Sequence, residues 1–228
     1  MLTKAGDPRD YEHEHAHGGM WRQRYEDDPK HLCFHLARYK HTAKLLAGMN
    51  NVLEVGCADG FGTRIVRQHV GSLTAIDTDE RSICEARLAS SPRWPVMFDY
   101  GDICDMVMRD DPIVQHEHMQ PKWYGYDAVY ALDVLEHISP DSDFLAGMAA
   151  AAPVAIIGTP SKESQQYASP MSKLGHCNCY SCEDLRARLL EYWGHVFIFT
   201  MHDEVLGTSF APMAQYLLAL CVEWRGTR

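Results

Sequence analysis

Three glycines fall within seven residues directly after an apolar run, in the sequence Val52-Leu53-Glu54-Val55-Gly56-Cys57-Ala58-Asp59-Gly60-Phe61-Gly62. An amphipathic segment, residues 63–70, follows them. Glycine tolerates positive φ and lets a ligand approach the backbone closely. A strand, a glycine turn and a helix in this order form a site for a nucleoside-bearing ligand at the carboxyl edge of a parallel sheet. The segment therefore predicts an α/β fold with a ligand site at this loop.

The spacing of Gly56, Gly60 and Gly62 separates this loop from two common phosphate-binding loops. It does not read as G-x-G-x-x-G, the fingerprint that seats the pyrophosphate of a dinucleotide. No lysine-serine or lysine-threonine pair follows the glycines, which excludes a P-loop. A dinucleotide oxidoreductase on the same layered fold remains a rival that the spacing disfavours, because such sheets host many activities.

Acidic residues end the apolar runs that follow the loop along the chain. The runs are residues 73–77, 96–102 and 126–133, and their terminal acids are Asp77, Asp102 and Asp133. An aspartate about one β-α-β unit after the loop can accept hydrogen bonds from both hydroxyls of a ribose. One such acid alone is read as a solvated strand end. Glu54, Asp77 and Asp102 at three consecutive strand ends together predict a bound cofactor.

At these residues, and at Leu135-Glu136-His137 after the last acid, the chain resembles the class I S-adenosylmethionine-dependent methyltransferases. Within them it is most similar to the small-molecule branch that includes the ubiquinone-biosynthesis O-methyltransferases. The resemblance runs from about Asn51 to the end of the chain and rests on four motifs in the expected order. Where the family usually has a glycine, this chain has Ala58, the least disruptive replacement.

The predicted fold is a Rossmann-like, doubly wound α/β sheet. Strands and helices alternate from residue 52 onward, which indicates parallel strands with crossover helices on both faces. The resemblance implies seven mostly parallel strands with one antiparallel strand near the C-terminus. The last two strands, predicted at 195–203 and 213–222, are joined by a turn at 207–209. Residues 49–228 then form one methyltransferase domain, and residues 1–48 form a lid segment and the first helix.

The resemblance implies a site for S-adenosylmethionine along the strand ends. The predicted cofactor-binding residues are Glu54, Gly56, Cys57, Ala58, Gly60, Gly62, Asp77, Thr78, Asp102, Ile103 and Asp133. In the family pattern, the glycine loop lines the methionine and ribose and Asp77 holds the ribose hydroxyls. Asp102 then meets the adenine amine and Ile103 packs on the ring. Asp133 would face the methyl group or the amino group of the cofactor.

Methyl transfer from a sulfonium needs a positioned nucleophile and, where required, a group that removes its proton. His137 is the predicted general base, because an imidazole titrates near neutral pH; alternatively, it opens the following helix. His176 lies in a His-x-Asn loop that resembles the family loop over the substrate pocket. The predicted substrate contacts are Glu136 and, in the lid segment, Tyr11, Trp21 and Tyr25. The lid aromatics suit a packed cap equally well.

The prediction for metal is that none is bound. Structural zinc sites normally use two well-separated ligand pairs, which is not the pattern of His176, Cys177, Cys179 and Cys182. Three alternating histidines would share one side of a strand, but they lie in a polar N-terminal stretch and are read as a solvated tail: His13, His15 and His17. Glu136 with His137 is a plausible ligand pair in some relatives.

The charge and the apolar content of the sequence argue against nucleic-acid and membrane partners. The net charge of −10 argues against a nucleic-acid partner, because nucleic-acid binders usually need a basic face. No apolar run reaches the ~18 residues that cross a membrane, and residues 1–8 lack the apolar core of a signal peptide. A cytoplasmic location follows, in which the eight cysteines are read as thiols.

The sequence thus predicts a methyltransferase that acts on oxygen, or nitrogen, of a small polar metabolite such as a sugar or a nucleotide-sugar. No membrane contact is expected, and a homodimer is allowed. The alternative is a protein that binds S-adenosylmethionine or S-adenosylhomocysteine but has lost catalysis. Ala58 and the stretch 103–125, which has no clear helix or strand pattern, leave room for that alternative.

Overall fold

A computed structural model of the chain describes residues 25–106, 125–208 and 210–224. Several sequence predictions lie outside these residues and are not tested by the fold. They are the substrate contacts Tyr11 and Trp21, the histidines at 13, 15 and 17, and most of the stretch 103–125.

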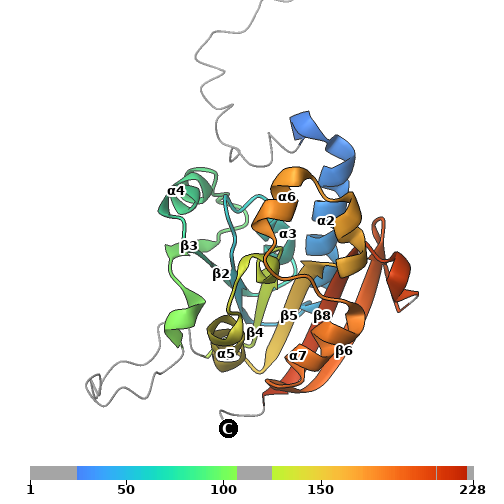
Figure 1. Cartoon of the computed structure of the whole chain (residues 1–228). Helices are drawn as coiled ribbons and strands as arrows, with labels where there is room; N and C mark the ends of the chain where they lie inside the picture. The colour runs from blue at the N-terminus through green and yellow to red at the C-terminus, as the bar shows by residue number, and fades with distance from the viewer. Residues whose placement is uncertain (1–24, 107–124, 209, 225–228) are drawn as a thin grey trace, which may run out of the picture.

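One eight-stranded sheet forms the centre of the protein (Figure 1). The strands are β1 (Asn51–Val55), β2 (Ser72–Asp77), β3 (Met97–Tyr100), β4 (Ala128–Leu132), β5 (Val154–Pro160), β6 (Trp193–His202), β7 (Val205–Gly207) and β8 (Tyr216–Trp224). Their order across the sheet is β3-β2-β1-β4-β5-β8-β6-β7. The first five are parallel, and β8 lies antiparallel between β5 and β6. The predicted mostly parallel α/β sheet is therefore confirmed.

The predicted number of strands is wrong, because the sheet has eight and not seven. The chain reverses directly after β6, at Asp203, whose φ of 56° is the left-handed conformation of a tight turn. Thr200, Met201 and His202 then pair with the short strand β7. The turn predicted at 207–209 was placed too late, so this edge strand was missed. The C-terminal part of the sheet consequently has two antiparallel strands, β7 and β8, instead of one.

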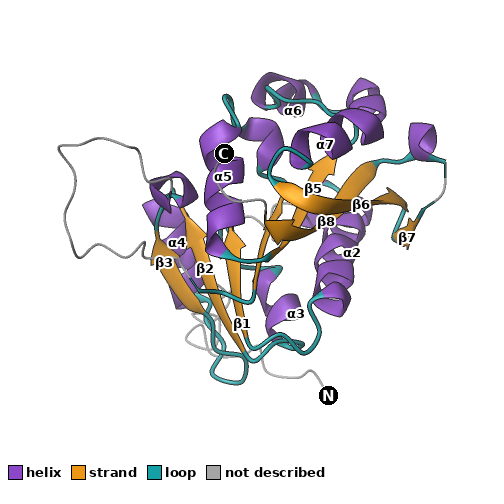
Figure 2. Cartoon of the chain, turned by 90° about the horizontal axis from the view of Figure 1, so that it is seen from below, coloured by secondary structure: helices purple, strands orange, loops and turns teal. Residues whose placement is uncertain are grey.

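Helices cover both faces of the sheet (Figure 2). Three of them pack on one face: α2 (Pro29–Leu45), α3 (Thr63–Arg67) and α4 (Glu80–Leu88). On the other face lie α5 (Ser142–Ala151) and α7 (Cys182–Leu189). Because side chains alternate along a strand, Val52 of β1 joins the first core, whereas Leu53 and Val55 join the second.

Short elements follow several strands at their carboxyl ends. They are η2 (Ile103–Met106), η3 (Leu135–His137), η4 (Lys162–Tyr167), α6 (Pro170–Gly175) and η5 (Ala211–Met213). Side chains cap the longer helices: Asp28 accepts hydrogen bonds from the first turn of α2, and Ser181 forms a capping box with Asp184 at α7. Among the described residues, no helix has the length and apolar character needed to span a membrane.

Candidate active site

The glycine loop turns away from the end of β1 at Gly56. Its φ is +76°, and a side-chain methyl group there would overlap Val134, which follows β4. The backbone N–H groups of Gly56 and Cys57 both donate to the carbonyl of Ile76 at 2.8 and 3.2 Å, which fixes the loop to β2. Gly56 therefore satisfies two requirements at once, a left-handed turn and the close approach of the β4 loop.

A cavity of 390 Å³ lies beside this loop at the carboxyl ends of the parallel strands. We call it the smaller cavity. Its lining residues are Val55, Gly56, Ala58, Asp77, Thr78, Gly101, Asp102, Ile103, Cys104, Asp133, Val134, His137, Ile138 and Phe144. Seven of the eleven predicted cofactor-binding residues are among them: Gly56, Ala58, Asp77, Thr78, Asp102, Ile103 and Asp133. A ligand at the carboxyl edge of an open α/β sheet is the general arrangement of such folds.

Asp77 connects the loop to the end of β2. One carboxylate oxygen accepts from the backbone N–H of Ala58 at 2.8 Å, and the other accepts from that of Asp79 at 2.9 Å. Ala58 has a φ of 48°, the region where glycine is preferred. The hydrogen bond to Asp77 thus holds the alanine that replaces the family's glycine in the conformation that the loop needs.

The other four predicted cofactor residues lie behind the loop and do not line the smaller cavity. A methyl group at Gly62 would overlap the ring of Tyr39 from α2, and one at Gly60 would lie 2.6 Å from Phe98. The Cys57 side chain is buried against α4. The glycines at 60 and 62 are thus explained by packing against aromatic rings, which glycine spacing alone does not distinguish from ligand contact.

Glu54 is the fourth of these residues, and its side chain is buried on the α2 face of β1. Burial raises the pKa of its carboxyl to about 7, and the nearby hydroxyls of Thr63, Tyr130 and Tyr39 offset only part of that shift. A group whose folded pKa is raised stabilises the fold below its unfolded pKa, and this contribution disappears as the pH rises through the folded pKa. Glu54 is therefore a pH-dependent element of stability beneath the loop.

We expect Glu54→Gln to raise the free energy of unfolding by roughly 2–3 kcal/mol at pH 8, because the buried charge is removed. At pH 4.5, where the folded protein holds Glu54 in its neutral form, the variant and the wild type should be nearly equal. Urea unfolding at both pH values measures the difference. Glu204→Gln, at an exposed turn, is the matched control and should change neither value. An equal effect of Glu54→Gln at both pH values would contradict the assignment.

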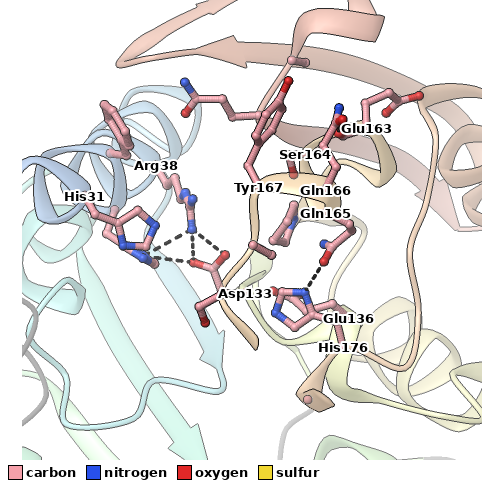
Figure 3. A pocket seen from close by; sticks show the side chains of 18 of the residues that line it. His31, Arg38, Asp133, Glu136, Glu163, Ser164, Gln165, Gln166, Tyr167 and His176 are labelled. Carbon is pink, nitrogen blue, oxygen red and sulfur yellow. Dashed lines mark hydrogen bonds and ion pairs between the residues drawn. The ribbon is translucent and has the colours of Figure 1, made fainter. Parts of the chain in front are cut away.

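A second, larger cavity of 1320 Å³ opens next to the first. Side chains of α2, of the 160–176 segment and of η5 surround it (Figure 3). Asp133 and His137 line both cavities. The boundary between the two cavities is therefore formed by Asp133, which directly follows β4, and by His137 at the end of η3.

Arg38 of α2 holds Asp133 in place at this boundary. Its guanidinium lies 2.6 and 2.7 Å from the two carboxylate oxygens, and it stacks over the Tyr216 ring at 4.0 Å (Figure 3). His35 lies 3.3 Å from the same carboxylate. Burial alone would raise the pKa of Asp133, but Arg38 and His35 together outweigh it and hold that pKa well below its usual range. Asp133 is thus ionised and paired.

Arg38 was not predicted as a site residue. It is buried within a helix whose apolar spacing indicates a packed face, and its partner lies 95 residues away in sequence. No local pattern in the sequence connects the two positions. The predicted role of Asp133 next to the cofactor is compatible with its place on the smaller cavity, although its carboxylate is already bound by Arg38.

His137 and His176 are brought together by a loop attached to η3. The backbone N–H groups of Cys177 and Asn178 donate to the Glu136 carbonyl, and the Asn178 amide donates to the carbonyl of Ile138. The two imidazole rings consequently lie 5.0 Å apart. The Nδ1 of His137 donates to the Gly175 carbonyl at 2.9 Å, which leaves Nε2 as the basic nitrogen.

Glu136 is buried beside these rings and lines the larger cavity, as predicted for a substrate contact. Burial, and then the charge of Asp133, raise the pKa of its carboxyl to about 8. Thr159 donates a hydrogen bond to it at 3.2 Å. Tyr25, another predicted substrate contact, is 57% exposed and lines neither cavity. The lid role of Tyr25 therefore has no support from the described part of the chain.

Glu136, His137 and His176 together form a group that could hold a metal ion, since one ligand atom from each lies within 4.8 Å of the others. Imidazole nitrogens and a carboxylate suit several divalent cations. The cysteines of the zinc alternative, Cys177, Cys179 and Cys182, are not part of this group. The sequence predicts no bound metal, whereas the structure places three possible metal ligands close together.

A doubly wound sheet with a cavity at its glycine loop and acids at successive strand ends defines a protein of the Rossmann-like α/β class. A family model described as a methyltransferase domain matches residues 20–192. The chain belongs to this family, and S-adenosylmethionine is its cofactor. No curated protein sequence matches the chain.

Solved structures of methyltransferases share the fold. The methyltransferase domain of bacterial CtHen1 is 14% identical, with a TM-score of 0.65 over 83% of this chain and 98% of that one. Magnesium protoporphyrin IX methyltransferase from Synechocystis is 17% identical, with a TM-score of 0.60 over 93% and 97%. The N-methyltransferase NodS from Bradyrhizobium japonicum is 20% identical, with a TM-score of 0.57 over 94% and 97%. At these identities the similarity establishes the fold and does not select the ubiquinone-biosynthesis branch.

Proposed function

We propose that the protein transfers the methyl group of S-adenosylmethionine, bound in the smaller cavity, to an oxygen of a small molecule bound in the larger cavity. The observation that carries this proposal is the shared wall: Asp133 and His137 line both spaces. An in-line displacement requires the acceptor atom to lie next to the sulfonium methyl group. A boundary of this kind is where the two reactants would meet.

The residues at the boundary support oxygen as the methylated atom. An acceptor hydroxyl must lose a proton, and the Nε2 of His137 is a base whose ring is oriented by Gly175. Burial raises the pKa of Glu136 to about 8, so this carboxyl is mostly protonated at neutral pH and accepts a proton only in its ionised fraction. Nitrogen remains the alternative, and one neighbour in fold is named as an N-methyltransferase.

An uncharged acceptor fits the larger cavity better than the nucleotide-sugar suggested by the sequence. Among the described lining residues, Arg38 is the single lysine or arginine, and Asp133 already binds its guanidinium. Among the described lining residues, a diphosphate would therefore meet acidic side chains such as Asp28 and Glu163 without an unpaired lysine or arginine. A polar, uncharged metabolite, including a sugar, remains within the proposed class.

The proposal is tested by binding and turnover with purified protein. We expect S-adenosylhomocysteine to bind with a stoichiometry of one in calorimetry and NAD to show no binding. A panel of hydroxylated acceptors should then release S-adenosylhomocysteine from S-adenosylmethionine. Binding without any release across the panel would favour the catalytically silent alternative. Binding of NAD in place of S-adenosylhomocysteine would favour the oxidoreductase.

A divalent cation is an alternative to the His137 base, supported by the group Glu136, His137 and His176, because the Nε2 of His137 cannot ligate a metal and accept a proton at once. A metal held there would lower the pKa of an acceptor hydroxyl and orient it. Calorimetric titration with Mg²⁺, Mn²⁺ and Zn²⁺ should show one site, and His176→Ala should weaken it at least ~10-fold because a ligand is lost. His195→Ala, exposed on β6, is the control and should bind as the wild type does. Absence of binding for all three cations would remove this alternative.

A further inference from the structure

Three large, exposed apolar side chains line the larger cavity. Tyr167 of η4 and Leu174 of α6 are each 84% exposed, and Met213 of η5 is 72% exposed. We call these three residues the apolar rim. Single exposed apolar residues are common on protein surfaces and need no explanation. Here, however, three residues from separate elements of the chain line one and the same cavity, and such a grouping marks a binding surface.

Polar groups line another part of the same cavity, at its boundary with the smaller one. Glu136 and the two imidazoles of His137 and His176 lie there, beside Asp133. In Figure 3 the Tyr167 ring lies apart from Glu136 and His176. A molecule that contacted both parts would need a polar, reactive group and a separate apolar part.

The size of the cavity also favours a molecule larger than its reactive group. A volume of 1320 Å³ exceeds the ~300–1,000 Å³ of ordinary small-molecule sites. Ligand sites are mostly apolar, with a few polar groups that fix orientation. Arg38 is the one arginine or lysine among the described lining residues, and it is paired with Asp133. No unpaired guanidinium in this lining is therefore available to bind an anionic acceptor.

We propose that the methyl acceptor is an uncharged amphipathic molecule whose apolar body packs on Tyr167, Leu174 and Met213 while its hydroxyl reaches His137 and His176. This inference rests on the proposed function and specifies its acceptor class. Another occupant to consider is a second copy of the chain, since an exposed apolar surface can also form a dimer interface. The larger cavity's continuity with the boundary at Asp133 and His137 favours the acceptor.

The neutral fluorescent probe N-phenyl-1-naphthylamine tests the apolar rim, because its emission rises in an apolar site. Titrated into protein saturated with S-adenosylhomocysteine, it should bind with a stoichiometry of one. The triple variant Tyr167→Ser, Leu174→Ser, Met213→Ser should weaken probe binding at least ~10-fold, since most of the apolar contact is removed. Leu88→Ser is the matched control: Leu88 is 81% exposed on α4, outside the cavity, and its loss should leave probe affinity unchanged.

Competition links the probe site to the acceptor. 2-Naphthol, with a hydroxyl on an apolar body, should displace the probe, and glucose should not. The proposal is overturned if the triple variant binds the probe as tightly as the wild type, or if glucose displaces it and 2-naphthol does not. It is also overturned if sedimentation shows that the triple variant dissociates a dimer while probe affinity is unchanged, which would assign the apolar rim to a second copy.

The binding of S-adenosylhomocysteine distinguishes a failure of the proposed function from a failure of the proposed acceptor class. Both the triple variant and Leu88→Ser should bind S-adenosylhomocysteine with wild-type affinity, because none of the four residues lines the smaller cavity. If the wild type itself does not bind S-adenosylhomocysteine, the proposed function fails. If it binds S-adenosylhomocysteine but the probe data do not depend on the apolar rim, only the acceptor class fails.

Discussion

Arg38→Met should lower the free energy of unfolding by about 3 kcal/mol at neutral pH, because it leaves the Asp133 carboxylate without its partner inside the protein. Arg38 makes two short contacts with Asp133 and stacks on Tyr216, and the side chains of Arg38 and Asp133 are only 9% and 21% exposed. Removing one member of such a pair costs more than removing both. Urea unfolding measures the loss.

The double variant Arg38→Met, Asp133→Asn should recover a large part of this stability, since no buried charge then remains. Arg81→Met is the control, because the ion pair of Arg81 with Glu85 is exposed and contributes little. If Arg38→Met changes stability no more than Arg81→Met does, or if the double variant is no better than the single one, the pair does not have the role assigned to it. Methyl transfer should also fall in Arg38→Met, since Asp133 borders both cavities.

Gly56→Ala should weaken the binding of S-adenosylhomocysteine at least ~30-fold. Alanine at a φ of +76° carries a backbone strain of ~1–2 kcal/mol, and its methyl group would also overlap Val134. The loop must move to relieve the overlap, and the smaller cavity that it lines moves with it. Calorimetry with S-adenosylhomocysteine measures the affinity.

Gly48 provides the matched control, because it has a φ of +88° and no atom within 4 Å of the added methyl group. Gly48→Ala carries a similar backbone strain but should leave cofactor affinity unchanged. The double variant Gly56→Ala, Val134→Ala should regain part of the lost affinity, since the overlap is removed and only the strain remains. Equal losses in Gly48→Ala and Gly56→Ala would show that the effect is general instability and not displacement of the loop.

The alternation of apolar strands and helices was enough to predict a doubly wound sheet, and the parallel strands lie within a residue or two of their expected positions. This succeeded because strand and helix periodicities are local properties of the sequence. The exception was β7, a three-residue strand with no periodicity of its own. It exists because Asp203 reverses the chain and β6 offers an edge with which to pair.

The functional edge was predicted in the same way. Asp77, Asp102 and Asp133 end strands that are parallel, so they meet at one edge whatever the rest of the chain does. Glycine spacing was less informative: Gly56 lines the cavity, whereas Gly60 and Gly62 lie against the rings of Phe98 and Tyr39. A missing side chain serves a ligand or a neighbouring ring equally well, and only the packing shows which.

By itself, the sequence determined the fold class, the sheet edge that carries the smaller cavity and the acids that line it, because short-range periodicity and strand direction control all three. The tertiary structure decided which residues complete the second cavity. Arg38 reaches Asp133 across 95 residues, and His176 reaches Glu136 and His137 because the 175–178 loop is hydrogen-bonded to η3. Contacts between distant segments depend on how helices and loops pack on the sheet, and no local spacing encodes that packing.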